Sequence, residues 1–132
     1  MSPKNFKDQE ELDVSLKEWQ NRLRLNDWTI KADLSRHKDM PFDYVCNGVI
    51  TVELKSLRAH IQILDPLDYP NGEPWPQDQE KTLVHELLHI HTKHMERVGI
   101  DAGANEDRMD VAHEQCVEAL ATAIMGMYRN EQ

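Results

Sequence analysis

Two histidines and a glutamate in residues 85–89 have the spacing that metal-assisted hydrolysis requires. His85 and His89 lie four positions apart, so on a helix both imidazoles project from one face and can bind the same divalent metal ion. Glu86 projects about 100° away from His85, beside that ion, where its carboxylate can hold and deprotonate a water molecule. The segment therefore predicts a hydrolytic site that uses zinc.

A long amphipathic helix must present these three side chains. Asp78 is a suitable N-cap for it, because Pro74 and Pro76 end the preceding segment. Its apolar positions fall on one side of the helical wheel: Leu83, Leu87, Ile90 and Val98, widened by Val84, Leu88 and Met95. The two histidines fall on nearly the opposite side. The sequence predicts a central helix that ends near Gly99, with one face on the core and the other on a site.

The remaining elements are predicted from hydrophobic periodicity. Residues 7–25 repeat apolar side chains at helical spacing. Apolar and polar residues alternate in three segments that predict strands: 28–34, 44–54 with Asn47-Gly48 as a bulge or turn, and 59–64. Residues 65–77 hold four of the six prolines and predict a loop. A last helix is predicted over 106–129, with this apolar stripe: Val117, Leu120, Ala121, Ile124 and Tyr128.

Composition narrows the class of protein. The 132 residues are 39% hydrophobic and 30% charged, which is typical of one globular domain spanning 1–132. The formal net charge of −9 disfavours a nucleic-acid surface. No apolar run reaches the roughly 18–20 residues of a membrane span, and the polar N-terminal residues do not resemble a signal peptide. Cys46 and Cys116 make no disulfide framework, so a cytoplasmic protein is expected.

The residues around the motif resemble a known family. Thr82 to His91 follows the extended pattern of zincin metallopeptidases, except that His91 stands where the pattern has a hydrophobic residue. The whole chain resembles the small, single-domain zincin-like metallopeptidases of the gluzincin type, including those encoded by phages and other mobile elements. The resemblance implies an α+β fold: an N-terminal helix, a small three-stranded, mostly antiparallel sheet, the motif helix and a C-terminal helix.

The resemblance also implies a third zinc ligand from the last helix. In gluzincins a downstream Glu binds the metal, and a residue four positions later supports a ligand His, so Glu114 is the expected ligand and Glu118 the expected support. His113, Glu118 and Asp110 remain alternatives, because helical geometry is only a weak constraint on which side chain faces the motif. Three tyrosines are available to stabilise an oxyanion, and the sequence selects none of them: Tyr44, Tyr69 and Tyr128.

The activity that the resemblance implies is hydrolysis of peptide bonds with Zn²⁺ as cofactor and Glu86 as general base. The partner would be an extended protein or peptide segment, paired with the edge of the strand that runs from Ala59 to Leu64. One alternative is a regulatory domain of the same fold that binds metal with little or no turnover. The other is a partner-binding protein that carries the motif by chance.

Overall fold

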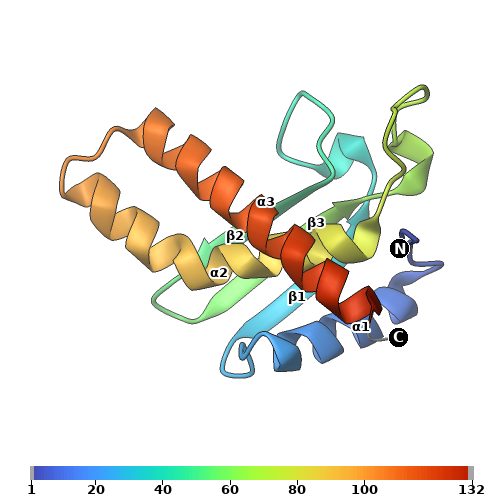
Figure 1. Ribbon diagram of the computed structural model, residues 1–132, viewed down its shortest axis with the longest axis horizontal. Coiled ribbons are helices and arrows are strands. Elements are labelled where there is room, and N and C mark those ends of the chain that lie inside the picture. The colour runs from blue at the N-terminus through green and yellow to red at the C-terminus, as the bar shows by residue number, and fades with distance from the viewer. Residues whose placement is uncertain (1, 131–132) are drawn as a thin grey trace.

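The computed structural model describes residues 2–130, which form three helices and one three-stranded sheet (Figure 1). The elements are α1 (Gln9–Arg22), β1 (Thr29–Ser35), β2 (Gly48–Glu53), β3 (Arg58–Leu64), α2 (Gln79–Asp101) and α3 (Glu106–Asn130), with short 3₁₀ turns at His37–Asp39 and Pro66–Asp68. The α+β class and the order of helices and strands agree with the prediction. The second strand is shorter than predicted, since residues 44–47 belong to the preceding loop.

The strand order is β1-β3-β2, with β3 in the centre. β2 and β3 form an antiparallel hairpin, whereas β1 pairs with β3 in parallel. The prediction of a mostly antiparallel sheet is therefore wrong, because one pair is of each kind. Alternation of apolar residues identifies a strand but does not select its neighbour, and here the chain crosses over so that β1 lies on the far side of β3 from β2.

One face of the sheet carries the core. The register places Ala32 of β1 beside Ile61 of β3, and Ile61 beside Ile50 of β2, so apolar side chains form rows across the strands. The opposite face is polar, and there His60 contacts Asp33. Helices α1 and α2 pack on the apolar face, which makes a two-layer domain with all three helices on one side of the sheet (Figure 1).

α1 is attached to the motif helix by buried contacts. Its N-cap is Asp8, whose side chain accepts a hydrogen bond from the backbone of Glu11. Leu12, Leu16 and Trp19 are buried beneath it. The Trp19 indole also donates a hydrogen bond of 3.1 Å to the carboxylate of Glu80 near the start of α2. α1 therefore holds the first turn of α2 in place as well as covering the sheet.

α2 begins at the predicted N-cap, Asp78, whose side chain accepts from the backbone of Lys81. Leu83 and Leu87 are fully buried, as the apolar stripe predicted. The predicted burial of this stripe is wrong near the C-terminal end of the helix, where Met95 and Val98 are 73% and 56% exposed. The reason is tertiary: the C-terminal end of α2 extends beyond the sheet, with α3 beside it (Figure 1).

α3 returns antiparallel to α2 after a short linker in which Gly103 has a φ of +102°, a conformation that favours glycine. Val117, Ala121 and Met125 are buried, while Leu120, predicted in the stripe, is 44% exposed. Near its end Arg129 donates to both carboxylate oxygens of Asp78, at 2.7 and 2.9 Å. Within the described chain, no helix is both long and apolar enough to span a bilayer.

Candidate metal centre

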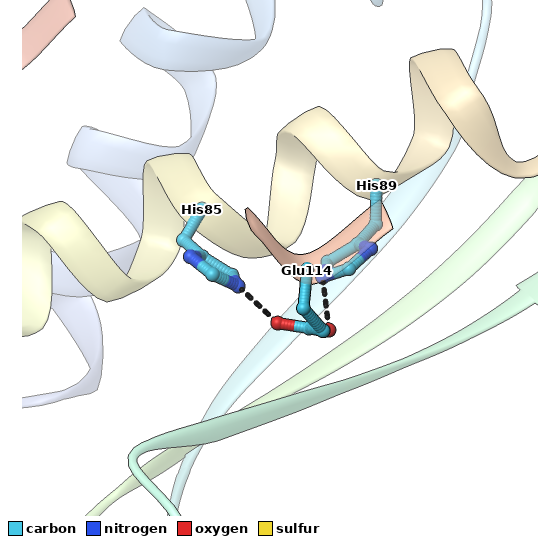
Figure 2. Close-up of side chains that lie close together, drawn as sticks. All are labelled: His85, His89 and Glu114. Atoms are coloured by element: carbon cyan, nitrogen blue, oxygen red, sulfur yellow. Dashed lines mark hydrogen bonds and ion pairs between the residues drawn. The ribbon is translucent and has the colours of Figure 1, made fainter. Parts of the chain in front are cut away.

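His85, His89 and Glu114 come together between α2 and α3. Nε2 of His85 lies 3.1 Å from one carboxylate oxygen of Glu114, and Nε2 of His89 lies 3.0 Å from the other. Figure 2 shows both imidazoles projecting from α2 toward this carboxylate on α3. One ligand atom from each residue lies within 4.8 Å of the others, so a single ion between them could contact all three.

Glu118 lies one turn after Glu114 and contacts the other nitrogen of His85. Its carboxylate is 3.1 Å from His85 Nδ1, and its second oxygen is 2.7 Å from the ammonium of Lys81. A carboxylate at this position accepts the Nδ1 proton and leaves Nε2 free to bind a metal ion. Lys81 precedes His85 by four residues and lies on the same helical face, which is the sequence signal that could have identified it.

His113, an alternative ligand by sequence, makes different contacts. The residue is 8% exposed, and its ring hydrogen-bonds through Nδ1 to Glu96 and through Nε2 to the hydroxyl of Thr92. The ring also packs edge-on against His89, with centroids 4.6 Å apart. Both nitrogens are thus occupied within the helix pair. The contact fixes the part of α3 from which Glu114 projects, because the two residues are neighbours in the chain.

Glu86 is the most buried carboxylate of the motif region that has no partner. It is 6% exposed, and no hydrogen bond or ion pair from residues 2–130 reaches its carboxylate. Burial, followed by the nearby charge of Glu114, raises the pKa of Glu86 to about 8. A carboxyl group in such a setting can exchange a proton near neutral pH.

Burial also keeps His89 neutral. It lowers the pKa of this imidazole to about 4, even though the charge of Glu114 acts in the opposite direction. The neutral imidazole is the form that binds a metal ion. Two neutral-imidazole nitrogens and one carboxylate are also the donor set of many three-ligand catalytic zinc sites, so the residues present fit zinc.

The strand beside the site is β2, not the one expected. Residues 59–64 lie in β3, whose two edges are both hydrogen-bonded, so they offer no edge to a peptide. β2 pairs only with β3 in the described chain, which leaves its outer edge unpaired. At its first residue, Gly48, a Cβ atom would lie 2.6 Å from Cγ2 of Thr82 and 3.4 Å from Cγ of Glu86. Glycine therefore allows this edge to approach the motif helix.

Two cavities open on either side of Glu86 and Gly48. The first, which we name the Trp75 cavity, has a volume of about 550 Å³ and includes Trp75, Tyr69 and His85 in its lining. The second, which we name the Tyr44 cavity, has a volume of about 560 Å³ and includes Tyr44 and His89. Glu86 lines both, so the site lies at the junction of one extended cleft.

The remaining predicted candidates separate into two groups. Tyr69 and Tyr44 each line one cavity, whereas Tyr128 packs against Trp19 with ring centroids 4.8 Å apart. Asp110 lines the Tyr44 cavity but is not among the three clustered donors. Residues that sequence reasoning missed include Glu96, which lies two helical turns after His89 on the same face of α2.

The geometry of these residues defines a candidate metal centre. Three donors of the right kind converge, one donor is oriented by Glu118, and an unpartnered carboxylate lies beside them in an open cleft. Comparison of the chain with protein-family models, with curated proteins and with solved structures finds no match in any of the three.

Proposed function

We propose that this protein is a zinc-dependent peptidase, in which His85, His89 and Glu114 bind Zn²⁺ and Glu86 acts as the general base. The observation that carries the proposal is Glu86 itself. Glu86 is 94% buried as a residue, no hydrogen bond or ion pair from the described chain reaches its carboxylate, and it lines both cavities beside three converged donors. A group kept in such an environment is typical of an active site.

The roles of the chain's residues follow from their positions. A zinc ion held there would polarise a scissile carbonyl and lower the pKa of a water molecule. Glu86 takes a proton from water in the cleft and returns it to the leaving amine. Glu118 holds the His85 ring in one tautomer and orientation through Nδ1. Because Gly48 has no side chain, the backbone of β2 can lie close to Glu86.

The substrate class is an extended peptide segment. The outer edge of β2 is unpaired in the described chain, and residues 48–50 line the Tyr44 cavity together with His89. A peptide in extended conformation would add to this edge through backbone hydrogen bonds, which require little sequence preference. This replaces the predicted docking on the strand of Ala59, which lies inside the sheet.

The test combines metal analysis with peptide cleavage. Purified protein is expected to hold one zinc ion per chain by mass spectrometry and to cleave members of a proteome-derived peptide library. Glu86→Gln should retain the zinc and lose about 10²- to 10⁴-fold in cleavage rate. His85→Ala should lose the zinc, whereas His94→Ala, an exposed histidine on the same helix, should keep both properties.

Two results would contradict the proposal. One is purified protein without stoichiometric metal after zinc supplementation. The other is cleavage by Glu86→Gln at the wild-type rate. Stoichiometric zinc with no cleavage of any library peptide would instead favour the metal-binding regulatory domain.

A further inference from the structure

The Trp75 cavity has an excess of negative charge. Its lining includes four carboxylates and a single lysine or arginine, Lys81. The carboxylates are those of Glu73, Asp78, Glu86 and Glu118. Two of them are neutralised within the protein, since Lys81 lies 2.7 Å from Glu118 and Arg129 lies 2.7 Å from Asp78. The other two, Glu73 and Glu86, have no cationic partner among residues 2–130, and the charge available to a ligand is that of the exposed Glu73, because burial disfavours the charged form of Glu86.

These two carboxylates lie in different settings. Glu86 is 94% buried and opens into the cavity at its junction with the metal centre. Glu73 is exposed on the loop between β3 and α2, and no hydrogen bond or ion pair joins it to any residue of 2–130. The cavity therefore presents one deep and one peripheral carboxylate to any ligand that enters it.

An exposed aromatic side chain lines the same cavity as Glu73. Trp75 is 70% exposed, which is unusual for so large an apolar side chain. The loop around it is held by Tyr69, whose hydroxyl donates to the carbonyl of Trp75 at 2.5 Å. The pKa of Tyr69 is raised first by burial and then by the charge of Glu73, which places that carboxylate near the phenol. An exposed indole and a free carboxylate in the lining of one cavity make a suitable site for an organic cation.

We propose that the Trp75 cavity binds a lysine or arginine side chain of the peptide, against Trp75 and Glu73, and thereby selects basic segments as substrates. The inference rests on the proposed function, since it assigns specificity to the same cleft. A neutral aromatic side chain could stack on Trp75 but would leave Glu73 unpaired, and an acidic side chain would be repelled. The formal net charge of −9 favours approach of basic segments over long range.

Peptide binding tests this selectivity separately from cleavage. The protein is the Glu86→Gln variant of the 132-residue chain with one equivalent of Zn²⁺, in which Glu73 and Trp75 are intact. The probes are acetylated and amidated octapeptides of neutral sequence, with one lysine, arginine, norleucine or glutamate moved through each position. At the best position we expect lysine and arginine peptides to bind about 3- to 10-fold more tightly than the norleucine peptide by calorimetry.

Variants then locate the preference. Glu73→Gln and Trp75→Leu should each reduce the ratio of lysine to norleucine affinity, and Trp75→Phe should retain part of it because an aromatic face remains. Glu10→Gln, which makes the same charge change on exposed α1, should leave the ratio unaltered. Added salt should lower the ratio in the parent protein more than in Glu73→Gln.

The outcomes separate this inference from the proposed function. Equal binding of lysine and norleucine peptides, no binding of any peptide, or a full preference in Glu73→Gln would each overturn the basic subsite. If wild-type protein still cleaves peptides in those cases, the peptidase proposal stands without it. A clear preference for basic peptides in a protein that cleaves none supports the subsite and contradicts the peptidase proposal.

Discussion

The orientation of the His85 ring depends on the carboxylate of Glu118, which lies 3.1 Å from Nδ1. Since such contacts stabilise the metal-binding tautomer, Glu118→Ala is expected to weaken zinc binding by about 10- to 100-fold, measured by competition with a chromophoric chelator. Lys81→Met removes the other partner of Glu118 but leaves the bond to His85, so it should bind zinc nearly as the wild type does. Wild-type zinc affinity in Glu118→Ala would contradict this role.

His113 contributes to the packing of α2 against α3 through its contacts with Glu96 and Thr92. It is joined to Glu96, and their side chains are 7% and 13% exposed. His113→Ala leaves that carboxylate with Lys93 alone, at 3.2 Å, and opens space beside His89. The free energy of unfolding of metal-free protein should fall by about 3 kcal/mol, measured by urea denaturation.

The matched control for this change is His94→Ala, which removes an exposed histidine from α2. Its free energy of unfolding should stay within about 0.5 kcal/mol of the wild type. Zinc affinity should also fall in His113→Ala, because Glu114 is the next residue of α3. If His113→Ala and His94→Ala behaved alike in both measurements, the helix pair would not depend on the His113–Glu96 contact.

At the scale of elements, the approach of β2 to α2 depends on one glycine. A Cβ at Gly48 would lie 2.6 Å from Cγ2 of Thr82, closer than side-chain atoms normally come. Gly48→Ala should therefore destabilise the protein by about 1–3 kcal/mol and reduce cleavage, because the strand must move away from Glu86. Thr82→Ser removes the clashing methyl group and keeps the hydroxyl that donates to Asp78.

The double variant provides the decisive comparison for this packing. Gly48→Ala combined with Thr82→Ser should recover most of the lost free energy of unfolding, so that the two changes are not additive. Gly99→Ala serves as the control, since its Cβ would meet only the flexible end of Met109. Additive effects in the Gly48–Thr82 cycle would show that the close approach does not determine the packing of β2 on α2.

The start of α2 and the end of α3 are joined through Asp78 and Arg129, whose side chains are 18% and 11% exposed. Arg129→Met should lower the free energy of unfolding by about 3 kcal/mol at pH 7, because it leaves Asp78 and Glu80 without their cation. Arg97→Met breaks an exposed pair with Asp101, and its cost should stay below about 1 kcal/mol.

The same ion pair predicts a dependence on pH. Burial acts to raise the pKa of Asp78, but hydrogen bonds from Arg129 and from the backbone of Lys4 and Lys81 outweigh it, so the pKa is lowered. The stabilisation is complete above the unfolded pKa of about 3.9 and is lost as pH falls through the lower folded value. The difference in stability between wild type and Arg129→Met should therefore narrow below about pH 4 in denaturation curves.

At the scale of the whole molecule, the candidate metal centre joins two helices that extend beyond the sheet (Figure 1). If zinc binds there, a free concentration of 100 times the dissociation constant should stabilise the fold by about 2.7 kcal/mol. Thermal unfolding should move to higher temperature with zinc and return with a chelator. Hydrogen exchange should slow in α3 near Glu114 and stay unchanged in α1.

The control for this linkage is a protein that lacks the donors. His85→Ala combined with His89→Ala should show the same thermal midpoint with zinc and with chelator. A zinc-dependent shift that persisted in this variant would place the ion elsewhere in the molecule. No shift in the wild type would contradict a metal centre between α2 and α3.

The spacing of residues within single segments was enough to predict the structural features that are determined by sequence neighbours. The four-residue spacing of His85 and His89 puts both rings on one helix face, and Asp78 caps that helix, because helical geometry is set by neighbouring residues. The alternation through Ile61 and Ile63 correctly predicted a strand with a buried face, because successive side chains of a strand point to opposite faces of the sheet.

Contacts between distant segments required the tertiary structure. Which strand lies at the edge of the sheet depends on strand pairing, and hydrophobic periodicity does not encode pairing. The prediction that residues 59–64 form an edge strand is therefore wrong, and only the fold shows that β2 is the edge strand beside Glu86. Glu114, rather than the adjacent His113, meets both imidazoles because the rotation of α3 is set by packing against α2. Val98 is exposed for a related reason, since a helical wheel cannot show where the sheet ends.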